Sequence, residues 1–144
     1  MKTRIFALLL AVAGLFVFSS CEKEVHTLYN FRFDVTNVRE DGAVAMVTTT
    51  YLTQDLGWGE SETIDNDAMT SDKAAQQNDE EALRDFREDV SEFNEGVLHG
   101  YYRQAGLQHV EGYITYTLIR VDDDCELASE KIDVFYDAAP ALGD

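Results

Sequence analysis

Polar and apolar residues alternate along the segment that follows residue 24. The apolar residues occupy odd positions: Val25, Tyr29, Phe31, Phe33 and Val35. The even positions carry mostly polar residues: His26, Asn30, Arg32, Asp34 and Thr36. A period of two predicts a strand with one buried face. Asp41-Gly42 then suits the positive φ angles of a tight hairpin, so we expect a second strand at residues 43–52, antiparallel to the first.

A helical repeat begins further along the chain. Large apolar residues recur at spacings of three and four: Leu83, Phe86, Val90, Phe93 and Val97. This spacing places them on one face of a helix over residues 79–97, with Asn78 and Glu81 as a capping pair at its start. The polar segment before it, residues 54–77, reads as a long loop.

The last third of the chain predicts a second hairpin. Residues 112–121 are apolar at both alternating sets of positions, which indicates a central strand buried on two faces. Asp122, Asp123 and Asp124 form the turn, and residues 127–136 alternate again. The predicted order is β-β-α-β-β. It gives an α+β fold over residues 25–136, with a four-stranded antiparallel sheet, one long helix packed on one face, and a loose tail at residues 137–144.

The first 21 residues have the pattern of an export signal. Lys2 and Arg4 precede an apolar run at residues 5–18, and Ser19-Ser20-Cys21 follows. A run of 14 residues is shorter than the roughly 20 that a membrane-spanning helix needs, which favours a removable signal peptide at residues 1–20 over a retained anchor.

Phe18-Ser19-Ser20-Cys21 resembles the lipobox of bacterial lipoproteins, with Phe18 where leucine is usual. The resemblance implies that Cys21 becomes the lipid-bearing first residue of the mature chain. Residues 21–24 would then form a lipidated linker. Glu22-Lys23-Glu24 is similar to the surface-export signal of Bacteroidota lipoproteins, although Val25 stands where a second acid is usual. The implied location is the cell envelope, as an outer-membrane lipoprotein facing the periplasm or the surface.

Charge narrows the range of partners. The whole chain has 11 basic and 28 acidic residues. Removal of Lys2 and Arg4 leaves 9 basic residues, so the mature net charge would be 9 minus 28, or −19. Nucleic acid and anionic lipid headgroups need clustered lysine and arginine, so neither is expected as a partner. The membrane contact predicted for this chain is the lipid on Cys21.

No cofactor or metal site is predicted. Clustered carboxylates occur at Asp65 and Asp67 and at Asp122, Asp124 and Glu126, but neither run has the glycine and glutamate positions of a calcium loop. His26, His99 and His109 lack metal-ligand spacing. With Cys21 lipidated, Cys125 has no partner within the chain; a buried thiol and an intermolecular disulfide both stay open.

No catalytic motif is present. The sequence lacks a glycine-flanked serine, a cysteine and histidine pair, a phosphate loop and a nucleotide fingerprint. Its many acids would allow a small carboxylate-dependent hydrolase, which is one alternative function. A purely structural accessory of a surface assembly is another.

Three aromatic residues are candidates for surface recognition. Trp58 lies between Gly57 and Gly59 in the predicted loop, and Tyr101 and Tyr102 lie between the predicted helix and third strand. Such rings stack on sugars or anchor protein partners. Alternatively, Trp58 covers the sheet and the two tyrosines begin another strand. The leading expectation is a non-enzymatic, lipid-anchored envelope protein that binds a protein or a glycan through these residues.

Overall fold

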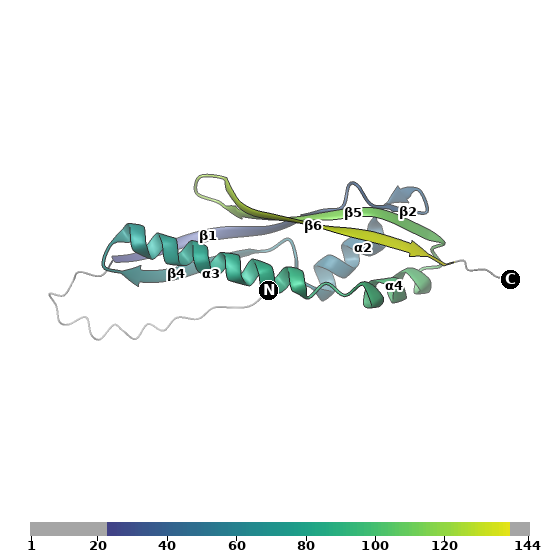
Figure 1. Cartoon of the computed structure of the whole chain (residues 1–144), viewed down its shortest axis with the longest axis horizontal. Helices are drawn as coiled ribbons and strands as arrows, with labels where there is room; N and C mark the ends of the chain where they lie inside the picture. The colour runs from purple at the N-terminus through teal and green to yellow at the C-terminus, as the bar shows by residue number, and fades with distance from the viewer. Residues whose placement is uncertain (1–22, 139–144) are drawn as a thin grey trace.

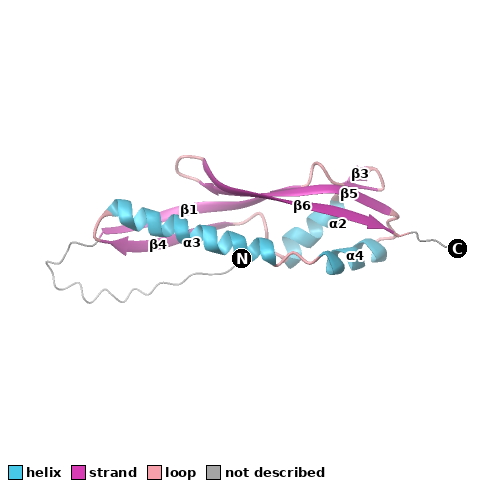
Figure 2. Ribbon diagram, in the orientation of Figure 1, coloured by secondary structure: helices cyan, strands magenta, loops and turns pink. Residues whose placement is uncertain are grey.

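The computed structural model of the chain describes residues 23–138. They form two layers, in which the helices all lie on one side of a single sheet (Figure 1, Figure 2). The strands are β1 (Lys23–Asp34), β2 (Arg39–Glu40), β3 (Ala43–Val44), β4 (Ser61–Ala68), β5 (His109–Arg120) and β6 (Cys125–Asp137). The helices are α2 (Met46–Thr50), which continues as the π-helical segment η2 (Tyr51–Asp55), α3 (Ser71–Ser91) and α4 (Glu95–Gln104). The predicted α+β class is confirmed.

The long central strand β5 organises the sheet. It pairs with β6 on one side and with both β1 and β2 on the other, and β4 pairs with the far side of β1. Every strand pair is antiparallel, as predicted. The predicted number of elements is wrong: residues 23–138 form six strands and three helices, where four strands and one helix were expected.

Alternation along β1 is confirmed by burial. Tyr29 and Phe31 are fully buried under the helices, and the polar residues of the opposite face point away from them. β5 was expected to be buried on both faces, which is wrong. Only Val110, Ile114, Tyr116 and Leu118 are buried, because no helix covers the face that carries Tyr113 and Ile119. The turn at Asp122–Asp124 and the strand after it are confirmed.

The expected strand at residues 43–52 is wrong. The Asp41-Gly42 hairpin forms, with φ angles of 52° and 81°, but it joins only the two-residue strands β2 and β3. From Met46 onward the chain is helical. A cap from outside the segment explains this difference, as described below.

The expected loop at residues 54–77 is also wrong, because it contains β4 and the start of α3. β4 has a polar sequence because part of its inner face hydrogen-bonds to α3. Asn66 donates through Nδ2 to Oδ1 of the buried Asn78, at 2.8 Å. Asn78 in turn donates to the carbonyl of Val25 at 3.0 Å and to the hydroxyl of Thr27 at 2.9 Å.

The single helix expected over residues 79–97 is two helices. α3 begins eight residues earlier, where the Thr70 hydroxyl accepts the N–H of Lys73 at 3.1 Å. Asn78 therefore lies inside α3 and does not cap it. The chain leaves the helix after Ser91, and Asn94 caps α4 by accepting the N–H of Val97 at 3.1 Å.

An ion pair joins α3 to the sheet. The Tyr29 hydroxyl donates to Asp79 at 2.6 Å, and the Arg120 guanidinium donates to the other oxygen of Asp79 at 2.6 Å. Arg120 also holds Asp123 in the β5–β6 turn, at 2.9 and 2.8 Å. These contacts link α3 to β1 and β5, so the position of α3 is fixed by polar contacts as well as by Phe86 in the core.

A close backbone approach at Gly112 separates β1 from β2. The turn at residues 35–38 lies against β5 there, and a Cβ atom on Gly112 would lie 1.9 Å from the Asn37 carbonyl oxygen and 2.7 Å from Val38 Cα. Gly112 also has a φ of 136°, which other residues rarely adopt. Glycine is therefore required at this close approach.

We expect Gly112→Ala to lower the free energy of unfolding by about 3 kcal/mol or more, because it adds both steric overlap and backbone strain. Gly100→Ala is the matched control: Gly100 lies in α4, and a Cβ atom there meets nothing within 4 Å. That substitution should be neutral or stabilising by about 0.5–1 kcal/mol. Urea unfolding measures both. Equal stabilities of the two variants would contradict the close approach at Gly112.

Candidate functional site

The helix α2 is capped by a residue outside it. Its N-cap residue, Ala45, has no side chain that can accept a hydrogen bond. The carboxylate of Glu40, which is 4% exposed, takes that place. It accepts the N–H of Val47 at 2.9 Å, the N–H of Thr48 at 2.7 Å and the Thr48 hydroxyl at 2.7 Å. A carboxylate at a helix N-terminus is favourable because the first N–H groups lack partners within the helix.

The same network reaches α4. The hydroxyls of Thr48 and Tyr102 lie 2.6 Å apart in the interior. Burial raises the pKa of Tyr102 above its usual value of 10.0, so its hydroxyl keeps its proton. Glu40, Thr48 and Tyr102 therefore fix α2 relative to both β2 and α4.

Threonines make the outer face of this helix effectively apolar. The hydroxyls of Thr49, Thr50 and Thr53 each donate to the carbonyl four residues earlier, at 2.6, 3.0 and 3.0 Å. A threonine bonded in this way has used its donor within the helix. What these side chains offer to a ligand is therefore chiefly their methyl groups.

The π-helical segment η2 directs one acid towards α4. Tyr51 and Leu52 of η2 are buried, and the Tyr51 hydroxyl accepts the N–H of Asn94 at 2.9 Å. At the end of η2, the Asp55 carboxylate accepts a hydrogen bond from the Tyr101 hydroxyl. This bond raises the pKa of Tyr101 above 10.0, so Tyr101 remains a neutral donor. π-Helical turns often occur at functional sites.

Two shallow grooves flank α2. The first, of about 490 Å³, lies between α2 and α4 and is lined by Met46, Val47, Thr50, Gln54, Asp55, Tyr101, Gln104 and Ala105. The second, of about 420 Å³, lies on the other side of α2 and is lined by Val35, Thr36, Arg39, Val44, Ala45, Met46, Thr49 and Thr50. We call these residues together the α2 patch. Met46 and Thr50 belong to both grooves and form the ridge between them.

The α2 patch is apolar and nearly uncharged. Val44 and Met46 are 66% and 69% exposed. Its only charged residues are Arg39, which donates to the carbonyls of Thr36 and Val38, and Asp55, which is bonded to Tyr101. Exposed apolar surface of this kind beside a groove is typical of binding sites for other proteins.

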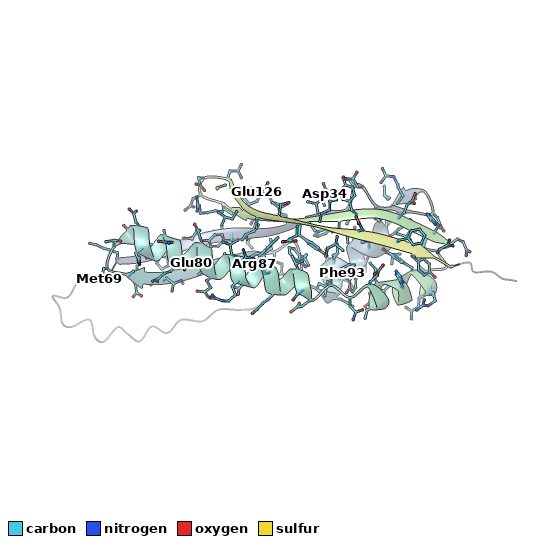
Figure 3. The ribbon with its side chains drawn as sticks, in the orientation of Figure 1. Asp34, Met69, Glu80, Arg87, Phe93 and Glu126 are labelled. Carbon is cyan, nitrogen blue, oxygen red and sulfur yellow. The ribbon has the colours of Figure 1, made fainter. Side chains whose placement is uncertain are left out.

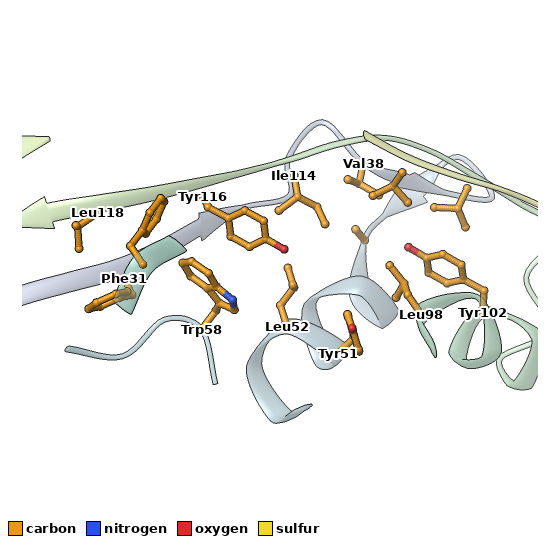
Figure 4. Packing of buried hydrophobic residues seen from close by; sticks show 14 of the residues in the cluster. Phe31, Val38, Tyr51, Leu52, Trp58, Leu98, Tyr102, Ile114, Tyr116 and Leu118 are labelled. Atoms are coloured by element: carbon orange, nitrogen blue, oxygen red, sulfur yellow. The ribbon is translucent and has the colours of Figure 1, made fainter. Parts of the chain in front are cut away.

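The structure separates the three aromatic candidates. Tyr101 lines the first groove. Trp58 is 2% exposed and lies 4.3 Å from Tyr116 between ring centroids, and Tyr102 is fully buried (Figure 4). Trp58 and Tyr102 are therefore core residues and offer no surface for a ligand, whereas Tyr101 stays in the candidate site. Both tyrosines belong to α4, so they do not begin a strand.

The histidines and acids do not form a metal site among residues 23–138, where no three metal-binding side chains come together. His26 contacts Asp65 at 2.5 Å, which raises the pKa of His26 above 6.5. His99 contacts Glu95 and His109 contacts Glu111, each at 3.3 Å. Cys125 is a free, half-buried thiol. Cys21 lies outside the described residues.

The residues that sequence reasoning missed are Glu40, Val44 and Met46. One signal could have found the patch: residues 42–54 form the longest run without a charged residue after Cys21. In so acidic a chain, such a run marks a surface kept free of charge. The run was interpreted as a strand because its threonines and valines favour strands.

No helix in the described part of the chain is long and apolar enough to cross a membrane.

We expect Glu40→Gln to lower the free energy of unfolding by about 2 kcal/mol, because hydrogen bonds to a charged acceptor contribute about 1.5–3 kcal/mol. Amide hydrogen exchange at Val47 and Thr48 should accelerate. Glu111→Gln is the control, because Glu111 is an exposed acid on β5 and surface substitutions usually change stability by less than about 0.5 kcal/mol. Unchanged exchange at Thr48 in Glu40→Gln would contradict the capping role.

Comparison of the chain with protein-family models, with curated proteins and with solved structures finds no match to any of them.

Proposed function

We propose that this chain is a non-enzymatic, lipid-anchored protein of the bacterial cell envelope, which binds a protein partner through the α2 patch. The observation that carries the binding function is the pair of grooves around the exposed Met46. Methionine adapts its shape to different apolar partners and is common at protein-binding surfaces. The anchor is supported by the sequence around Cys21.

A protein fits the α2 patch better than a glycan. Glycan sites combine aromatic faces with free hydrogen-bonding groups, whereas here the hydroxyls of Thr49, Thr50 and Tyr101 are already bonded within the chain. The ridge at Met46 and the second groove beside it offer mainly methyl groups, a thioether and valine, while the amides Gln54 and Gln104 line the first groove on its α4 side. Such a surface gains free energy mainly by burial against another apolar surface.

The binding function predicts that Val44→Ser with Met46→Ser weakens binding of the partner about thirtyfold, because the two lost apolar contacts contribute about 1 kcal/mol each. Both side chains are exposed, so the fold should be preserved. Met69→Ser is the matched control. Met69 is 66% exposed, close to the 69% of Met46, and lies beside the start of α3, far from α2 (Figure 3).

The measurement is cross-linking of the full mature chain to native envelope fractions, followed by mass spectrometry. A protein captured by the wild type and by Met69→Ser, but lost in the double variant, supports the proposal. Equal capture by all three chains would rule out the α2 patch as the binding surface. Capture of a protease-resistant glycan would favour the glycan alternative.

The anchor predicts that the membrane fraction contains a chain beginning at an acylated Cys21. Intact-mass measurement detects both the missing residues 1–20 and the added acyl chains. Two or more acyl chains on one residue hold a protein at the membrane stably, whereas one chain holds it only marginally. Cys21→Ala should abolish the acylated species, and Cys125→Ala is the control. A membrane-bound chain that still contains residues 1–20 would show that this proposal is wrong.

A further inference from the structure

The α2 patch carries only two charged residues, Arg39 and Asp55, but the chain that carries it is strongly acidic. The net charge of the whole sequence is −17, yet residues 42–54 contain no charged side chain. The first groove takes its only charged lining residue, Asp55, from just after that run. The binding surface is thus an apolar area within an acidic molecule. The negative charge around it affects which partner can approach it.

Acidic side chains lie around the patch. Asp34 accepts the N–H of Thr36, which lines the second groove, at 2.8 Å, and this bond lowers the pKa of Asp34. Glu111 is the strand neighbour of Arg39 and its side chain is 65% exposed. Asp41 is exposed on the hairpin that carries Val44. We call Asp34, Asp41, Asp55 and Glu111 the acidic rim.

The basic side chains near the patch are fewer. Arg39 donates to two backbone carbonyls. Arg103 is exposed on α4, beside the lining residue Gln104. The rim therefore has four acids against two arginines, with the His109 ring 3.3 Å from Glu111, and the net charge of the whole chain has the same sign as the excess of acids. The charge of the rim and the net charge of the whole chain are therefore both negative.

We propose that the partner presents an apolar contact surface surrounded by lysine and arginine side chains. This inference rests on the proposed binding function of the α2 patch. Opposite charges around an apolar contact steer the encounter and select the partner, while the apolar contact supplies most of the affinity. A second copy of this chain would place one acidic rim against another, so the charge argues against self-association through this surface.

The test uses two synthetic amphipathic helical peptides of about 18 residues, with the same leucine face and with either lysine or glutamine on the polar face. Binding to the full mature chain is measured by calorimetry at about 50 and about 300 mM NaCl, which changes the range of electrostatic screening. We expect the lysine peptide to bind at least about tenfold more tightly at low salt. That advantage should shrink at high salt.

Three paired variants locate the effect. Val44→Ser with Met46→Ser should weaken binding of both peptides. Asp34→Asn with Glu111→Gln should weaken binding of the lysine peptide about threefold or more, because the two substitutions remove two negative charges from the rim. Binding of the glutamine peptide should stay unchanged. Asp67→Asn with Asp122→Asn removes two exposed acids outside both the patch and the acidic rim: Asp67 pairs with Glu24 near the start of β1, and Asp122 lies in the β5–β6 turn. It is the matched control.

The outcomes separate the two proposals. An equal effect of the rim pair and the control pair would mean that the peptide senses only the total charge, and would overturn the inference. Equal affinity for the two peptides, or no binding of the lysine peptide, would also overturn it. If both peptides bind and Val44→Ser with Met46→Ser weakens neither, the proposed binding function itself fails.

Discussion

One buried carboxylate, that of Glu40, holds β2, α2 and α4 together. A charge removed from water destabilises the fold by several kcal/mol unless donors surround it, and here three donors come from the first turn of α2. The carboxylate is therefore stable in the interior only when residues 46–50 are helical. Conversely, α2 starts at an alanine that cannot cap it. Glu40 and α2 each require the other, and the contact of Thr48 with Tyr102 extends this dependence to α4.

This mutual dependence explains why the local sequence pattern predicted a strand at residues 43–52, where most of the segment is helical. Threonine and valine favour strands, and a five-residue helix without a cap is unstable by itself. The cap comes from Glu40, on the other side of a hairpin, and its position is set by the pairing of β2 with β5. Periodicity describes neighbours within an element, so it carries no information about hydrogen bonds that α2 makes across the hairpin to Glu40 of β2.

Elements with their own periodicity were predictable: β1, β6 and the apolar stripe of α3. β5 was predicted as a strand from its apolar run, although its burial on two faces was not found. Elements stabilised by long-range polar contacts were not predictable. The polar strand β4 depends on Asn66 meeting Asn78 on α3, and the helix break before α4 depends on Asn94. For the candidate site, the sequence offered Tyr101 and Tyr102 together, whereas the structure places Tyr101 at the first groove and Tyr102 in the core. Adjacent residues in a helix point about 100° apart, so one tyrosine lines the groove while the other enters the core.

The distance between the proposed anchor and the α2 patch follows from β1. Its 12 residues span about 36 Å at about 3.3 Å per residue. The second groove begins at Val35, immediately after the last residue of β1. β4 pairs with the first part of β1 and β5 with the last part, so β1 is paired along its length. A lipid on Cys21 would attach the end opposite the patch. Surface potentials decay over about 8 Å in physiological salt, so headgroups at the attachment point would lie several such lengths along β1 from the acidic rim and would leave its charge unscreened.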